Sequence, residues 1–276
     1  MSIRTIETTL EIGLAAPVRV LHMSDTHLTE ADLRDGERKV ELAARRSQYY
    51  RAAKDVLRTA AEISAREQIP ILHTGDISDF VSQANLEIAR DFVEETDCFL
   101  AAGNHEFSLY VGEAIEDEAY RNQSLAKVQA VYKNDIRASS RVIGGVNFIA
   151  LDNGYYQFDE GQLAFLKSEV KRGLPIVLMF HTPLYEPVLC DIMRKKRPCA
   201  YLVAVPDEIG DTYTDDRMRL QLANSVTRET VEYIKNEKSI RAILAGHLHI
   251  DYEGVFGDRI PQLTTDCEHL RIVTFV

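Results

Sequence analysis

Five apolar segments of the chain each end in residues that can bind a metal ion or handle a proton. In chain order, the segments and the polar residues that follow them are 18–23 with Asp25 and His27, 71–74 with Asp76 and Asp79, 98–102 with Asn104, His105 and Glu106, 176–180 with His181, and 242–245 with His247 and His249. Short apolar runs of this kind are typical of buried strands. Because α/β sheets place their ligand crevices at strand ends, the five runs predict one metal site built from neighbouring strands.

The spacing within the polar groups supports this interpretation. Asp25 and His27 are two residues apart, and so are His247 and His249. Side chains alternate along a strand, so each pair is expected to point to one side. Glycines allow tight turns beside the ligands, at Gly75, Gly103 and Gly246. Mixed carboxylate and imidazole ligands suit Mn²⁺, Fe or Zn²⁺ better than Ca²⁺.

The elements that must position these residues alternate between strands and helices. Periodicity predicts an edge strand in Thr5–Leu14, helices over Lys39–Ala65, Val81–Glu95, Glu160–Lys171 and Thr227–Asn236, a weaker and broken helix over Glu113–Tyr132, a strand pair over Arg141–Leu151, and strands over Gly254–Val276. Strands that alternate with helices, with additional strand pairs between them, predict an α/β or α+β core.

Bulk composition narrows the class of protein. The 276 residues carry a formal net charge of −11, which disfavours binding to nucleic acid or to anionic membranes but permits a small phosphorylated substrate. The first residues do not resemble a signal peptide, and no apolar run approaches the roughly 20 residues that a membrane span needs. The four cysteines form no C-x-x-C pair. Reduced thiols and a cytoplasmic location are therefore expected.

The ordered set D-x-H, G-D-x-x-D, G-N-H-E, a lone His and G-H-x-H closely resembles the calcineurin-like metallophosphoesterase superfamily, in particular bacterial small-molecule phosphodiesterases and phosphatases. The resemblance extends from Asp25 to His249. It implies a four-layer α/β (α+β) sandwich in which helices flank two mixed β-sheets. It also implies a single domain over residues 1–276, and we expect a candidate lid insertion at about 182–225.

The resemblance further implies which residues form the site. Two metal ions, Mn, Fe or Zn, would be held by Asp25, His27, Asp76 and His249 for the first and by Asp76, Asn104, His181 and His247 for the second. Asp76 would bridge the two. His105 would act as the general acid that protonates the leaving oxygen. Asp79 or Glu106 would orient an imidazole through its second nitrogen, and we favour Asp79 for a supporting position behind the ligands.

The implied activity is hydrolysis of a small phosphodiester, such as a cyclic nucleotide, by a metal-bound hydroxide. The alternative is a phosphomonoester of a small metabolite or nucleotide. Asp79 is followed by Phe80-Val81 instead of the Arg-Gly of the protein phosphatase branch, which disfavours protein dephosphorylation. The negative net charge of the chain disfavours a nuclease. A non-catalytic binding scaffold is disfavoured because every ligand position is filled. The oligomeric state is left open.

Other polar and aromatic residues are expected to have ordinary roles. We interpret His22 and His73 as core histidines and His269 as a surface residue. The basic run 194–197 is predicted to be solvated, and the alternative is a lid whose cations meet a phosphorylated substrate. Arg45, Arg46, Tyr49 and Tyr50 are assigned to an amphipathic helix. Three tyrosines in the candidate lid are weak candidates for stacking on a base: Tyr185, Tyr201 and Tyr213.

Overall fold

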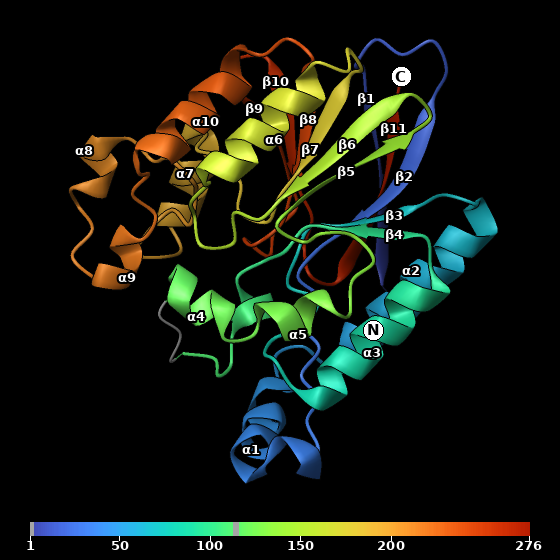
Figure 1. Cartoon of the computed structure of the whole chain (residues 1–276), viewed down its shortest axis with the longest axis vertical. Coiled ribbons are helices and arrows are strands. Elements are labelled where there is room, and N and C mark those ends of the chain that lie inside the picture. Colours follow the sequence, from blue (N-terminus) through green and yellow to red (C-terminus); the bar gives the residue numbers. More distant parts are fainter. Residues whose placement is uncertain (1–2, 113–115) are drawn as a thin grey trace.

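Two mixed β-sheets lie face to face in the computed structural model, which describes residues 3–112 and 116–276 (Figure 1). The five-stranded sheet has the order β1 (Arg4–Leu10), β11 (His269–Phe275), β2 (Val18–Met23), β3 (Ile71–His73), β4 (Cys98–Leu100). The six-stranded sheet has the order β5 (Ala138–Ile143), β6 (Val146–Leu151), β7 (Ile176–Met179), β8 (Ile240–Ala245), β10 (Ile260–Thr264), β9 (Tyr252–Phe256). The predicted α/β sandwich is confirmed.

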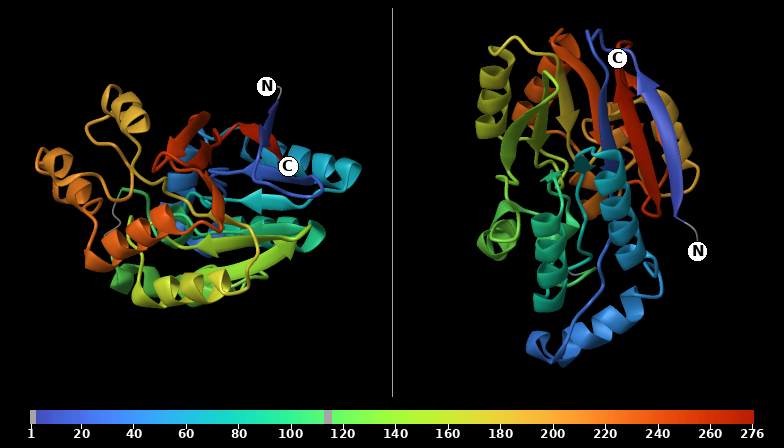
Figure 2. Two further views of the ribbon diagram at one scale, coloured as in Figure 1. Left: turned by 90° about the horizontal axis from the view of Figure 1, so that it is seen from above. Right: turned by 90° about the vertical axis from the view of Figure 1, so that its right-hand side faces the viewer.

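Helices cover the outer face of each sheet, which gives the four layers (Figure 2). The five-stranded sheet packs against α2 (Ala53–Glu67) and α3 (Gln83–Glu95), and the six-stranded sheet packs against α6 (Glu160–Val170) and α10 (Ser225–Asn236). A separate apolar cluster fills the space between the sheets. The sequence folds this way because its central strands are apolar on both faces.

Alternation along the central strands divides their side chains between these layers. Val20 on β2 joins the cluster between the sheets, while Leu21 faces α2 and α3. On β7, Val177 faces the other sheet and Leu178 faces the outer helices. The continuous apolar runs of the sequence are therefore strands buried on both sides, and their ends are fixed relative to one another.

The predicted single helix over Lys39–Ala65 is wrong. The segment forms α1 (Glu37–Arg46) and α2, with a turn between them. The two helices pack on different apolar clusters: Leu42 and Ala43 of α1 contact Phe80, whereas α2 packs on the five-stranded sheet. Because both segments have the apolar periodicity of a helix, the sequence pattern did not indicate the break between them.

Other elements follow the expectations more closely. The edge strand is β1, and Asp159 caps α6 by accepting a hydrogen bond from the Gln162 amide. The weak helical segment contains α4 (Glu118–Asn122) and α5 (Leu125–Gln129), and its residues 113–115 lie outside the described part. None of the described helices has the length and apolar composition that a bilayer span requires.

The remaining helices of the described residues are short. They are the 3₁₀ helices η1 (Leu33–Asp35) and η2 (His105–Phe107) and the α-helices α7 (Pro187–Arg194), α8 (Asp207–Gly210) and α9 (Asp216–Arg219). The last three belong to the segment 182–225 and gather on one side of the molecule (Figure 1). This segment packs around a separate apolar cluster, to which Leu248 also belongs. The single-domain assignment and the movement of this segment as a lid stay predictions.

Candidate metal centre

The five polar groups lie at the carboxyl ends of parallel strands from both sheets. β2, β3 and β4 are parallel neighbours in one sheet, and β7 and β8 are parallel neighbours in the other. Backbone hydrogen bonds join the loops that follow them, from the Asp25 amide to the Gly75 carbonyl (2.9 Å) and from the Gly246 amide to the His181 carbonyl (2.8 Å). The site therefore lies where the two sheets meet.

Left-handed backbone turns bring the side chains together. Five candidate ligands have positive φ angles between 52° and 68°, namely Asp25, His27, Asp76, His247 and His249. This conformation is uncommon for residues other than glycine, and it persists only where surrounding structure holds it. The prediction that strand alternation aligns Asp25 with His27 is wrong, because both residues follow the end of β2 and are aimed by turns instead.

Close approach of the loops explains two of the motif glycines. A Cβ atom on Gly103 would lie 2.2 Å from Asp76 Oδ1, and one on Gly246 would lie 1.8 Å from Ser24 Oγ. Neither position has room for a side chain. The glycines thus allow the backbone to pack against the carboxylate-bearing loops.

The first group of candidate ligands consists of Asp25, His27 and His249. His249 Nε2 lies 3.3 Å from Asp25 Oδ1 and 3.1 Å from His27 Nε2. The three ligand atoms lie within 4.8 Å of one another. This is the set that the sequence assigns to the first ion, apart from the bridging Asp76.

The second group consists of Asp76, His181 and His247. His181 Nε2 lies 3.1 Å from Asp76 Oδ2 and 3.1 Å from His247 Nδ1. Asp76 Oδ2 also lies 3.7 Å from His27 Nε2 in the first group. Asp76 therefore stands between the two groups, where a bridging ligand would have to be.

The donor set fits metal ions. Asp25 Oδ1 and Asn104 Oδ1 are buried and have no hydrogen-bond partner among the described residues. A buried polar atom without a partner costs roughly 1–3 kcal/mol, and a cation would remove that cost. These two oxygens, among the buried oxygens without a partner, belong to residues that the family resemblance assigns as ligands. Carboxylate, amide and imidazole donors together suit a first-row transition metal.

Electrostatics keep the carboxylates ready to bind cations. Burial would raise the pKa of Asp25, but the imidazoles of His181, His249 and His27 outweigh it and hold the pKa well below the ordinary value. Burial would lower the pKa of His181, but Asp76 and Asp25 raise it to about 9. Without metal, the cluster therefore attracts a proton. A metal ion would compete with that proton, since bound ligands must be deprotonated.

His105 faces the cavity with one nitrogen held from behind. Its Nδ1 lies 2.7 Å from the backbone carbonyl oxygen of Asp79. A carbonyl only accepts hydrogen bonds, so Nδ1 carries a proton and Nε2 is left for the cavity. Burial lowers the pKa of His105, with Asp76 and Asp79 acting in the opposite direction. The residue has the geometry of a proton donor to a bound substrate.

Asp79 supports the first ligand group. Its Oδ1 lies 3.1 Å from His27 Nδ1, which orients the imidazole so that Nε2 faces the first ligand group. Glu106 does not orient an imidazole. It accepts hydrogen bonds from three backbone amides, those of Asp76, Ile77 and Gly103, at 2.6–2.7 Å. Glu106 thus fixes the ligand loops through their backbone.

Sequence analysis missed the contribution of Arg46 and Tyr50. Arg46 forms a bidentate ion pair with Asp79, with Nε 2.6 Å from Oδ2 and a terminal nitrogen 2.8 Å from Oδ1. The Tyr50 ring stacks on His27 with centroids 4.2 Å apart. Both residues lie at the end of α1 or in the turn after it. Only the break between α1 and α2, which helical periodicity conceals, would have pointed to them.

The residues that we interpreted as structural are also placed. His22 and His73 are buried and lie within hydrogen-bond distance of threonine hydroxyls, so the core assignment is confirmed. His269 is half-buried beside Asp251, with the Nδ1–Oδ2 distance 2.5 Å, so its assignment to the surface is only partly correct. The four cysteines are free thiols, as expected.

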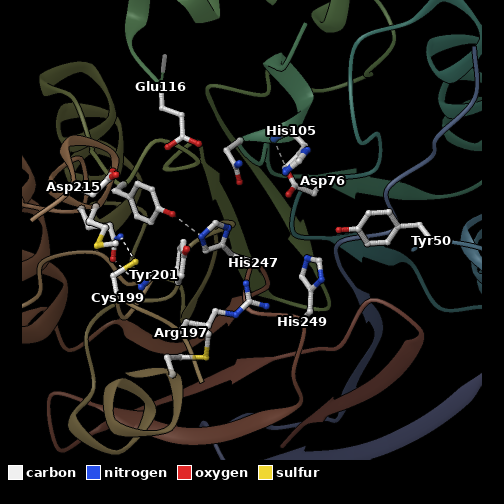
Figure 3. Close-up of a pocket in the computed structure, with 15 residues that line it drawn as sticks. Tyr50, Asp76, His105, Glu116, Arg197, Cys199, Tyr201, Asp215, His247 and His249 are labelled. Atoms are coloured by element: carbon white, nitrogen blue, oxygen red, sulfur yellow. Dashed lines mark hydrogen bonds between the residues drawn. The ribbon is translucent and has the colours of Figure 1, made fainter. Parts of the chain in front are cut away.

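A cavity of about 380 Å³ opens over the candidate centre (Figure 3). One side, here called the metal wall, consists of Asp76, Asn104, His105, His247 and His249. The facing side, here called the cover wall, consists of Met193, Arg197, Cys199, Tyr201, Asp215, Met218 and Gln221. Tyr50, Glu116 and Tyr156 complete the lining. The candidate lid thus supplies the cover wall. Of its three tyrosines named above, Tyr201 lines the cavity.

Comparisons with known proteins agree with this architecture. A family model described as calcineurin-like phosphoesterase matches residues 18–251. The fold is similar to that of a dimetal phosphatase from Danio rerio, with 13% identity, a TM-score of 0.52, and coverage of 93% of this chain and 91% of that one. It is also similar to a proposed 5′-nucleotidase from Staphylococcus aureus in complex with α-ketoglutarate (12% identity, TM-score 0.50), covering 94% of this chain and 51% of that one. No curated protein matches the chain.

Proposed function

The chain belongs to the calcineurin-like phosphoesterase family of metal-dependent hydrolases, and from this premise we propose that it hydrolyses a small phosphodiester, with cyclic nucleotides as the first candidates. The observation that carries the proposal is the position of His105. Its imidazole lines the cavity beside Asp76, and its Nδ1 is occupied by the Asp79 carbonyl. A proton held at Nε2 would be available to a leaving oxygen.

The ligand assignment is part of the proposal. We propose that Asp25, His27, Asp76 and His249 hold one ion, and that Asp76, Asn104, His181 and His247 hold the other. Two bound ions would neutralise charge on the phosphoryl oxygens and activate water for attack. The ligand types suit Mn, Fe and Zn, and availability decides among the ions that one donor set accepts.

The remaining chemistry is assigned to side chains of this chain. A diester leaves as an alkoxide, which is a poor leaving group unless it is protonated. His105 would donate that proton from Nε2, and its lowered pKa makes the protonated imidazole a stronger acid. Asp79 would keep both His105 and His27 in position. Arg46 would in turn hold Asp79, since it binds both carboxylate oxygens.

The size of the cavity supports a small substrate. Its volume of about 380 Å³ is at the lower end of the range for small-molecule sites. A polymer would need an open groove and phosphate-binding cations along it. The lining contains carboxylates at Glu116 and Asp215 besides the candidate ligands. A nuclease is therefore disfavoured.

A phosphomonoester is the second candidate, because one observation favours it. Arg197 brings a guanidinium to the cavity, and a monoester near neutral pH carries more negative charge than a diester. Cations that clamp phosphoryl oxygens stabilise that charge during transfer.

The test compares a chromogenic diester, bis(p-nitrophenyl) phosphate, with the monoester p-nitrophenyl phosphate. The protein is stripped with a chelator and then reloaded with Mn²⁺, Fe²⁺ or Zn²⁺ in parallel. Activity that returns with metal and favours the diester is the expected result. A preference for the monoester would move the assignment to the second candidate. Absence of turnover on both esters with metal bound would contradict general phosphoester hydrolysis.

A further inference from the structure

The basic run of residues 194–197 divides into two parts. All four side chains are exposed, but only Arg197 lines the cavity. Figure 3 shows its side chain pointing from the cover wall toward His247 and His249. Arg194, Lys195 and Lys196 do not belong to the lining. The prediction that the run is solvated therefore holds for all four residues, and Arg197 in addition lies where the alternative of a cation that meets the substrate requires it.

The Arg197 guanidinium contacts an aromatic ring. Among the described residues, none forms a hydrogen bond or an ion pair with its side chain, and its carbon Cζ lies over the Tyr201 ring at 5.6 Å from the centroid. By contrast, both oxygens of Asp79 engage the other guanidinium near the site, that of Arg46. Arg197 is therefore available to a ligand, whereas Arg46 is committed to the protein.

The distribution of charge around the cavity defines where a substrate anion fits. Among the described lining residues, Arg197 is the only Lys or Arg. Outside the metal wall, the other charged lining residues are the carboxylates Glu116 and Asp215, and each of them has an interaction within the protein. Among the described lining residues, Arg197 is therefore the side chain whose charge suits a second anionic group of the substrate.

Tyr201 contacts both this position and the metal wall. Its ring centroid lies 5.9 Å from that of His247 and 5.6 Å from the Arg197 guanidinium. The guanidinium and a candidate metal ligand therefore lie beside the same aromatic ring. A compact molecule could place one phosphoryl group at the metal wall and a second charge at Arg197.

We propose that Arg197 is a specificity-determining residue that binds a second anionic group of the substrate, a phosphate or a carboxylate, close to the reacting phosphoryl group. The proposal rests on the proposed function and narrows it to small phosphate esters with two acidic groups. Arg197 acts in binding and takes no part in the proton transfer assigned to His105. Bidentate guanidinium pairing with either anion gives the required selectivity.

The test uses adenosine derivatives that differ at one position. The reacting group is either a 2′,3′-cyclic diester or a 3′-monoester, and the 5′ position carries a hydroxyl, a carboxylate or a phosphate. We expect kcat/KM to be about tenfold to a hundredfold higher with a 5′ anion than with the hydroxyl, because charge-assisted hydrogen bonds are the strong ones. The carboxylate and phosphate arms show which anion the site prefers.

Variants connect the preference to Arg197. In Arg197→Gln, the ratio of kcat/KM between the anionic and the hydroxyl compounds should fall at least about tenfold. Lys196→Gln is the matched control, because it removes the same charge from the same exposed run without changing the cavity lining. The control should keep the wild-type ratio. Dissociation constants from calorimetry for the same compounds should change in parallel.

Two results would overturn the proposal: no preference for a 5′ anion in the wild type, or an unchanged ratio in Arg197→Gln. If the ratio were unchanged because kcat/KM fell equally for all six compounds, Arg197 would act on the reacting phosphoryl group instead. If the wild type hydrolyses none of the compounds and neither chromogenic ester, the proposed function fails. The dissociation constants then still decide this proposal, because binding does not require turnover.

Discussion

The metal wall and the cover wall face the same cavity but are built in different ways. The metal wall consists of loops that follow strand ends, and its candidate ligand Asp76 is almost fully buried, as are the candidate ligands Asp25 and His181 outside the lining. The cover wall comes from short helices and turns within residues 193–221. Side chains hold it in place, as where the Ala200 amide donates to Tyr213 Oη (3.1 Å).

This difference separates the class of chemistry from the choice of substrate. The ends of paired strands position the metal wall. Its residues therefore follow apolar runs at short spacings, which can be recognised in the sequence. The cover wall depends on packing between short helices, and such segments tolerate change. Members of a family can therefore keep the same reaction while changes in the cover wall select a different substrate. The predictions below ask whether the two walls can be perturbed separately.

The largest effect is expected from His105→Gln, which removes the proton donor from the metal wall. We expect kcat to fall by about 10²–10⁴-fold, the range for loss of a general acid. Metal content by elemental analysis should not change, because His105 is not among the proposed ligands. His269→Gln is the control for loss of a histidine away from the cavity lining. If metal content fell in proportion to kcat, His105 would be structural instead.

Acid should lower the stability of the fold by protonating His73, a buried histidine at the end of β3. The Gly75 amide donates to His73 Nδ1 and Nε2 lies 2.9 Å from Thr26 Oγ1, so the imidazole is neutral in the fold. Burial lowers the pKa of His73 from 6.5 to about 4. Since the folded value is below the unfolded one, the fold loses stability as pH falls from 6.5 toward 4, by up to roughly 3 kcal/mol. Above pH 6.5 the contribution does not change.

Urea unfolding of the metal-free protein at pH 7 and pH 4.5 measures this loss. His22, whose pKa burial lowers to about 3, contributes in the same direction. His73→Gln should reduce the difference between the two pH values by roughly 2–3 kcal/mol and leave the His22 part in place. An unchanged difference would show that His73 does not limit acid stability.

Arg46→Gln tests support of the metal wall from outside the motifs. Without Arg46, Asp79 loses a bidentate partner and His27 is held less firmly. We expect a fall of about 10–100-fold in metal affinity or activity, the usual result when the partners of metal ligands are removed. Arg45→Gln is the matched control, since Arg45 is the exposed neighbour at the same helix end. Equal effects of the two substitutions would point to helix stability or net charge instead.

Tyr213→Phe should perturb the cover wall alone. It leaves the buried Ala200 amide without its acceptor, which costs roughly 1–3 kcal/mol of unfolding free energy. KM should rise a few-fold because Tyr201 and Cys199 adjoin this amide in the cavity lining, while metal affinity stays at the wild-type value. Calorimetric metal titration and substrate kinetics measure the two quantities separately. A loss of metal affinity would show that the walls are coupled.

Local patterns in the sequence predicted the α/β core and the strand ends that carry the candidate ligands, whereas the four layers were implied by the family resemblance. Buried strands appear as apolar runs, and the candidate ligands follow them at once. Asp25 follows β2 in one sheet and His247 follows β8 in the other, so the packing of the two sheets brings them together. The reason for their alignment was not predictable. Positive φ angles at Asp25 and His27 leave no mark in residue types, and alternation suggested a strand instead.

Residues that approach the site through tertiary packing were also missed. Arg46 reaches Asp79 because α1 ends at that point, and the periodicity of Lys39–Ala65 does not show the break. Arg197 follows α7 within a run of similar cations, so composition cannot separate it from Lys196. Short-range pattern identifies strand ends and motifs, whereas the partners across the cavity depend on contacts between distant segments.

Metal stoichiometry tests the central claim most directly. Chelator-treated protein is titrated with Mn²⁺ by calorimetry, and the wild type is compared with Asp76→Asn, which weakens the proposed bridging ligand. The account predicts two ions per chain in the wild type and one or fewer in the variant. A single ion in the wild type, or two ions that bind equally well to the variant, would contradict a bridged pair of metals at the meeting point of the two sheets.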